Sequence, residues 1–117
     1  MLNDITKHGD IEKLVDTFYS AVLDDALLAP FFTHIDFTHH KPRMIHFWSF
    51  VLLDEPGYTT NIFDKHSHMG LTQEALAQWV LLFEQTVRQD FSGEKAEQAI
   101  LRAKTIAWTF QEKMKLG

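Results

Sequence analysis

The sequence predicts an all-α protein built as a single domain. In four separate stretches, apolar residues recur at intervals of three and four positions, which is the spacing of one face of an α-helix. No stretch of useful length alternates apolar and polar residues as a half-buried strand does. At 117 residues the chain fits one domain, residues 1–117, without room for a second core.

The first helix is predicted to begin after Asp10, which has the short acidic side chain that an N-cap prefers. Tyr19 places a hydroxyl on the buried side of this helix, where it either bonds a backbone carbonyl in the core or donates into a pocket. Asp24 and Asp25 end the helix. The apolar segment that follows contains Pro30, and we expect it to form one tight helical turn. The predicted buried face is Ile11, Leu14, Val15, Phe18, Tyr19 and Val22.

A third helix is predicted from about residue 39 to 53, with Thr38 as its cap and Pro42 tolerated in its first turn. His40 heads one apolar face of this helix. It is either a satisfied boundary residue or, if that face meets His66, part of a site. Arg43 flanks the same face and reaches the rim of whatever it covers. The face comprises His40, Met44, Phe47 and Val51.

Residues 54–61 are rich in turn-forming residues and predict a loop. A helix then follows Thr72 and runs to about Asp90, with Leu76, Trp79, Val80 and Phe83 on one apolar face. Ser92 is the expected cap of a last helix over roughly residues 94–115. Its predicted buried residues are Ala96, Ala99, Ile100, Ala103, Ile106, Ala107 and Phe110.

His66 precedes the apolar face of the helix that starts after Thr72. A histidine on a short turn at this point has two interpretations. It is a surface residue in a polar loop, or its imidazole coordinates a planar metal cofactor that lies on the apolar face. Met69 and Leu71, between His66 and the helix, add apolar surface to the second interpretation.

Composition excludes several functional classes. The net charge of −5 gives no general attraction to nucleic acid or to an anionic membrane, and the longest apolar runs are too short for a membrane span. The absence of cysteine excludes disulfides, thiolate haem ligation and iron–sulfur clusters. The start of the chain has no hydrophobic signal-peptide run, so we expect a cytoplasmic protein. Zinc clusters, di-iron Glu-x-x-His motifs, phosphate-binding loops and nucleophile elbows are not found.

The remaining chemistry is that of an aromatic-rich helical domain with two histidines near apolar faces. Iron in a porphyrin needs one strong imidazole donor, a large dry slot, cations for its propionates and selected hydrogen-bond donors on the other side. This chain has a candidate for each requirement: His66 for the imidazole, the many apolar and aromatic residues for the slot, and Arg43 for the cation. Tyr19, His40 and Trp79 are the candidate hydrogen-bond donors.

Three patterns in the chain together resemble the truncated haemoglobins, and most closely their third group. The match as a whole runs from about residue 10 to 110, nearly the whole chain. The patterns are F-Y-x-x-V-L-D-D-x-L-L-x-P-F-F, then H-x-x-x-M-x-x-F-W-x-x-x-L-L, then H-x-x-M-x-L-x-x-x-x-L-x-x-W-V-x-L-F-x-x-T-V. The resemblance implies a sandwich of two helices on two around a haem.

The resemblance also implies roles for single residues. His66 matches the proximal iron ligand, and Phe32 matches the phenylalanine that wedges against the porphyrin. Tyr19 and Trp79 match distal donors to a bound ligand, and His40 matches the distal histidine of the third group, which acts as a gate. Arg43 matches a position that pairs with a propionate, Met44 lies further into the distal pocket, and Trp48 narrows an apolar access route. The residues expected to contact the haem are Phe32, His40, Arg43, Met44, Phe47, Tyr58, Ile62, Phe63, His66, Met69, Leu71, Trp79 and Phe83.

The implied cofactor is haem b, iron protoporphyrin IX, with O₂, CO, NO or peroxide as small ligands and an unidentified reductase as partner. The implied function is ligand retention, sensing or detoxification rather than bulk transport. One alternative is an enzyme with peroxidase-like or nitric-oxide dioxygenase activity, in which Tyr19, His40 and Trp79 serve catalysis. A second is a helical interaction module without cofactor, whose apolar faces would enclose no cavity. Direct ligation of iron by His40 is a further possibility.

Overall fold

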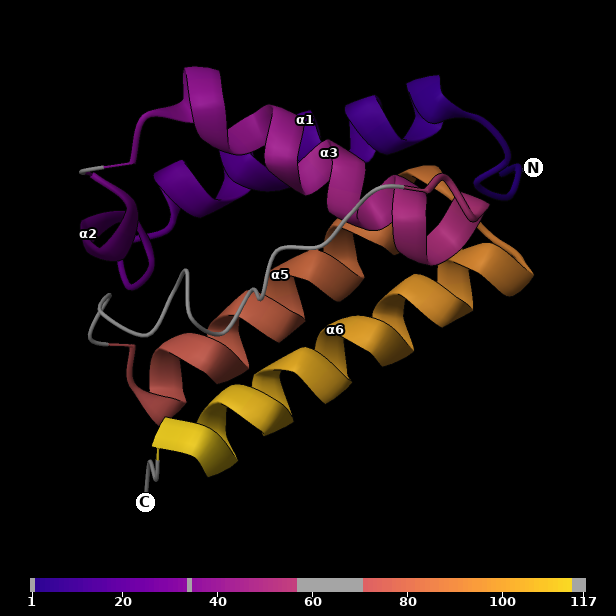
Figure 1. Cartoon of the computed structure of the whole chain (residues 1–117). Helices are drawn as coiled ribbons and strands as arrows, with labels where there is room; N and C mark the ends of the chain where they lie inside the picture. Colours follow the sequence, from indigo (N-terminus) through magenta and orange to yellow (C-terminus); the bar gives the residue numbers. More distant parts are fainter. Residues whose placement is uncertain (1, 34, 57–70, 115–117) are drawn as a thin grey trace.

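The structure is a computed structural model that describes residues 2–33, 35–56 and 71–114. Within these residues the elements are α1 (His8–Asp24), α2 (Ala29–Phe32), α3 (Phe37–Leu53), α5 (Gln73–Asp90) and α6 (Glu94–Met114), and there is no strand. Figure 1 shows α1 and α3 together on one side, with α5 and α6 on the other. α1 also contacts α5, and α3 contacts α6. The all-α prediction and the two-on-two sandwich are confirmed.

The apolar face of α1 is buried as its periodicity predicts: all six residues of the predicted face lie in the core. The predicted N-cap was wrong, however. α1 begins at His8, and Asp10 lies in its first turn, where its carboxylate accepts hydrogen bonds from the backbone N–H groups of Thr6 and Lys7 at 2.9 and 3.2 Å. An acidic side chain that bonds backward over the first turn stabilises the helix start as well as a cap does.

α3 begins two residues earlier than predicted. Asp36, not Thr38, is its cap, because the Asp36 carboxylate accepts from the Thr38 N–H at 3.0 Å. Pro42 therefore lies inside the helix, past the first turn. It has no backbone N–H, so the carbonyl of Thr38, four residues earlier, lacks its helical hydrogen bond.

The predicted apolar face of α3 is only half-buried, and the fully buried residues of this helix are Trp48, Ser49 and Leu52. The helix ends at Leu53, and the following Asp54 is its C-cap, with the left-handed φ of 58° that an Asp tolerates. The Asp54 N–H donates to the Ser49 carbonyl. The half-buried face is explained by the cavity described below, because Met44 and Phe47 line it.

α5 is capped as predicted: the Thr72 side chain accepts from the Ala75 N–H at 3.0 Å. The predicted cap of α6 was wrong. Its first-turn amides, those of Lys95 and Ala96, both donate at 2.9 Å to the carboxylate of Asp4, far away in sequence. The segment before α1 is thus fixed on the turn between α5 and α6, and Ile5 within it is fully buried.

Among the helices of the described residues, none combines the length and the apolar character that a bilayer crossing requires.

Candidate functional site

A cavity lies among the helices, with an empty volume of about 700 Å³ when the part open to solvent is included. Ten of its thirteen lining residues are Phe, Leu, Ile, Ala or Met, and the other three are Tyr19, Trp48 and Trp79. A cavity of this size and character takes a large apolar molecule, with polar hydrogens available at few points. The lining residues are Phe18, Tyr19, Leu28, Phe32, Met44, Phe47, Trp48, Leu71, Ala75, Leu76, Trp79, Ile106 and Phe110.

Tyr19 brings a buried hydroxyl to the cavity wall. It lies on the core face of α1 and forms a hydrogen bond of 3.0 Å between its hydroxyl and Nε2 of His40 on α3. The rings of Tyr19, His40 and Phe37 pack together, with centroid distances of 5.3 to 5.9 Å. Burial raises the pKa of Tyr19 far above its ordinary value, so its side chain stays a phenol and keeps a proton to donate.

The direction of the bond between Tyr19 and His40 depends on the tautomer of the imidazole. With Nε2 unprotonated, the Tyr19 hydroxyl donates to His40. With Nε2 protonated, His40 donates to the Tyr19 oxygen, and the phenol hydrogen is available to a molecule in the cavity. His40 is half-exposed and Tyr19 is buried, so the pair connects the cavity with the surface of α3.

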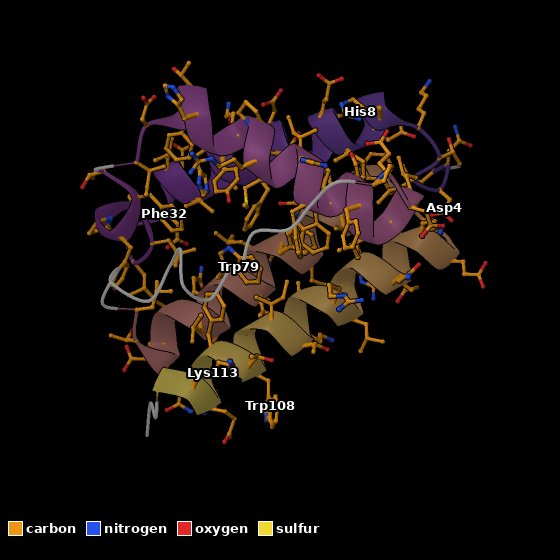
Figure 2. All side chains as sticks on the ribbon, viewed as in Figure 1. Asp4, His8, Phe32, Trp79, Trp108 and Lys113 are labelled. Carbon is orange, nitrogen blue, oxygen red and sulfur yellow. The ribbon has the colours of Figure 1, made fainter. Side chains whose placement is uncertain are left out.

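Trp79 lies in the opposite wall, on α5, and Figure 2 labels it among the side chains between the two helical layers. Its ring stacks on Phe83 at 5.8 Å and meets the edge of Phe18 at 5.7 Å. Phe83 in turn stacks on Trp48 at 4.8 Å. Among the described residues no hydrogen bond to the Trp79 indole N–H is found, and the side chain lines the cavity.

Several predicted cofactor contacts lie in the cavity wall: Phe32, Met44, Phe47, Leu71 and Trp79. Phe83 lies behind the wall, buried beneath Trp79 and Phe18. His40 reaches the site through Tyr19. Arg43 is exposed on α3 and forms no ion pair with any described residue. Tyr58, Ile62, Phe63, His66 and Met69 lie outside the described residues.

Sequence reasoning missed other parts of the wall. They are residues that the periodicity assigned to the hydrophobic core or to no role, and periodicity alone does not separate a core face from a cavity face. Trp48, expected to narrow an access route, lies in the wall as well. The missed residues are Phe18, Leu28, Ala75, Leu76, Ile106 and Phe110.

The chain was compared with known proteins. No protein-family model matches the sequence. The chain is 31% identical over 108 residues to a protein of Campylobacter jejuni named group 3 truncated haemoglobin ctb, and the match covers 86% of this chain and 85% of that protein. The structure is similar to the crystal structure of group III truncated haemoglobin from Campylobacter jejuni, with a TM-score of 0.86, 28% identity, and coverage of 97% of this chain and 95% of that one. Both similarities extend over most of the helical arrangement.

Proposed function

This chain belongs to the truncated haemoglobin family, and on that basis we propose that it binds haem b and, through the haem, O₂ and other diatomic ligands such as CO and NO. The cavity is the observation that carries the proposal. Its apolar lining suits a flat macrocycle, and this supports a haem protein over a cofactor-free interaction module, which would have solid apolar faces.

His66 is the proposed ligand of the iron. Leu71, five positions later in the sequence, lies in the cavity wall, and this supports the assignment. Arg43 is the proposed partner of a propionate, since it is an exposed cation on the helix that carries Met44 and Phe47 into the wall. Phe32, Leu71 and Trp79 would pack against the macrocycle.

Haem supplies an iron that coordinates a diatomic molecule. The protein determines how long that molecule stays. A Tyr19 hydroxyl and a Trp79 indole N–H that reach one cavity are two donors for a partly anionic ligand, and hydrogen bonds to such acceptors are stronger than those between neutral groups. The arrangement suits ligand retention, sensing or detoxification better than bulk transport, which needs ready release.

The pair of Tyr19 and His40 favours a second candidate, an enzyme with peroxidase-like or nitric-oxide dioxygenase activity. A half-exposed imidazole bonded to a buried phenol at 3.0 Å can pass a proton between solvent and the cavity. Nitric-oxide dioxygenase turnover would also require a reductase to restore ferrous iron. Peroxide turnover that is unchanged in Tyr19→Phe and Trp79→Phe would contradict this candidate.

Absorption spectra of the purified protein in its ferric, ferrous and CO-bound forms test the proposed function. We expect a Soret band that is lost in His66→Gly and retained in His68→Gly, a control two positions along the same segment. A colourless folded protein, or a band that survives in His66→Gly and disappears in His68→Gly, would contradict the proposal. Low-spin bis-histidyl bands in the ferric spectrum would indicate that His40 ligates the iron.

A further inference from the structure

Asp25, at the end of α1, is a junction of hydrogen bonds. Its Oδ1 accepts from the backbone N–H groups of Leu27 and Leu28 at 2.9 and 3.0 Å, which shapes the turn into α2. Its own carbonyl accepts from the Ala29 N–H at 2.9 Å. One carboxylate oxygen thus fixes the segment that carries Leu28 and Phe32 into the cavity wall.

The second carboxylate oxygen of Asp25 reaches across to α5. Its Oδ2 accepts from Nε2 of Gln78 at 2.6 Å, although the two residues are 53 positions apart. Gln78 lies directly before Trp79, on the part of α5 that lines the cavity with Ala75, Leu76 and Trp79 itself. The Asp25–Gln78 hydrogen bond therefore joins the α1–α2 turn to the half of α5 that carries the indole donor.

This bond is of the stronger kind, because the acceptor is ionised and the distance is short. The Gln78 hydrogen bond, followed by that from Leu28, lowers the pKa of Asp25, so the carboxylate remains charged at neutral pH. The carboxylate has no proton to donate, and the amide nitrogen of Gln78 must face it. The interaction consequently fixes both the spacing of the two segments and the orientation of the Gln78 side chain.

We propose that Asp25 and Gln78 are positioning residues for the ligand site: their hydrogen bond holds the Trp79 indole at the distance from the Tyr19 side of the cavity at which it donates to a bound ligand. The inference rests on the proposed haem function. Loss of the bond lets the first half of α5 move relative to the α1–α2 turn, and the indole donor moves with it. Neither residue lines the cavity, so both act through Trp79 and Leu28.

Two variants of Gln78 break the bond in different ways. Gln78→Glu places a second carboxylate against Asp25 and introduces repulsion, and Gln78→Met removes the amide at similar volume. In the haem-loaded protein we expect the O₂ dissociation rate to rise by about fivefold in both variants. This is less than the effect of losing a hydrogen bond to the bound ligand entirely, because the indole donor is displaced and not removed. The CO dissociation rate should change by less than about twofold, since bound CO is a weaker acceptor.

Rescue separates positioning from general damage. In the double variant Asp25→Asn with Gln78→Glu, the Asn amide donates to the new carboxylate while its oxygen still accepts from Leu27 and Leu28. We expect the double variant to restore the O₂ rate to within about twofold of wild type, as complementary pairs do in double-mutant cycles. Gln85→Glu, an exposed position on α5, is the matched control for added charge and should leave the rate unchanged.

The indole N–H signal of Trp79 in the NMR spectrum of the CO-bound ferrous protein gives a readout independent of ligand kinetics. It should shift in Gln78→Glu and Gln78→Met, return in the double variant and stay in place in Gln85→Glu. An unchanged O₂ rate and indole signal in Gln78→Met, beside a normal Soret band, would overturn this inference alone. A wild-type protein without a Soret band would overturn the proposed function and this inference with it.

Discussion

At Tyr19 a single hydroxyl serves two potential partners, His40 and a molecule in the cavity. If it donates to a bound ligand, Tyr19→Phe removes a hydrogen bond of about 1.5–3 kcal/mol to a partly anionic acceptor. We expect the O₂ dissociation rate to rise by roughly 10- to 100-fold. Stopped-flow displacement of O₂ measures this rate, and an unchanged value would remove Tyr19 from the donors.

Burial raises the pKa of Tyr19 well above its ordinary value of 10.0, and this predicts how its contribution depends on pH. The phenol stays protonated as the pH rises from 7 to 10, so the ratio of the O₂ dissociation rates of Tyr19→Phe and wild type should not fall over that range. A ratio that collapses toward one near pH 10 would indicate an exposed tyrosine instead.

The Trp79 indole is the second donor of the proposed site, and the chain provides a natural control for it. Trp79→Phe keeps an aromatic ring that stacks on Phe83 but loses the N–H, and we expect the O₂ dissociation rate to rise by about tenfold. Trp108, which is 63% exposed, points away from the body on the outer side of α6 (Figure 2). Trp108→Phe should therefore leave the rate unchanged, and equal effects of the two substitutions would contradict the assignment.

At the scale of helices, the capping of α6 by Asp4 predicts a change of stability with pH. Burial opposes ionisation of Asp4, yet hydrogen bonds from the N–H groups of Lys95, Ala96 and Ile5 lower its pKa. A lowered folded-state pKa contributes stability above the ordinary value of 3.8, and this stability is lost as the pH falls through the lowered pKa. Asp4→Ala should cost about 1–2 kcal/mol at pH 7.

Urea unfolding of wild type and Asp4→Ala at pH values from 7 to 2 measures the difference, which should shrink in the acid part of the range. Glu112→Ala, an exposed carboxylate near the other end of α6, is the control and should cost less than about 0.5 kcal/mol. A cost for Asp4→Ala that stays constant down to pH 2 would contradict the capping role of the carboxylate.

Gly93, in the turn between α5 and α6, is required for two reasons. Its φ of 137° is a conformation that side chains rarely adopt, and a Cβ there would lie 2.6 Å from Cγ of Asp4. Gly93→Ala should therefore destabilise the protein by about 2 kcal/mol or more, through backbone strain and displacement of the Asp4 cap. The same change at Gly9, where no atom lies within 4 Å, should be nearly neutral or stabilising in the same unfolding measurement.

The helices and their buried faces were predictable because their signal is local: apolar residues at helical spacing describe α1, α5 and α6 almost completely. The bonds that join distant segments were not. Asp4 lies more than 90 positions from the amides it caps, and Asp25 lies 53 positions from Gln78. No local pattern marks either carboxylate, since an acidic residue near a helix end is equally well a solvated one. The cap of α3 was likewise not predictable from local sequence, because Asp36 and Thr38 are both residue types that suit an N-cap.

At the scale of the whole molecule, the two helical layers enclose a cavity beside their shared hydrophobic core. The sequence predicted several of its wall residues, among them Phe32, Phe47 and Trp79, because the resemblance assigned them a role. It did not predict Ile106 and Phe110, which periodicity alone places in the core of α6. A cavity is a property of how four helices diverge, and no single helix carries that information.

A cavity of this kind also couples folding to the proposed cofactor. Without an occupant, apolar walls such as those of Phe18, Leu76 and Phe110 lose packing partners, so the haem-free protein should be less stable than the haem-loaded one. A ligand that binds only the folded state adds RT ln(1 + [L]/Kd), which is about 2.7 kcal/mol at a free ligand concentration of 100 Kd.

We therefore expect the midpoint of urea unfolding to rise when haem is restored to the haem-free protein, and to rise further as free haem increases. His66→Gly should weaken this dependence, because the substitution removes the proposed ligand of the iron. Identical midpoints with and without haem would mean that the cofactor binds elsewhere or not at all, and the cavity would then need another occupant.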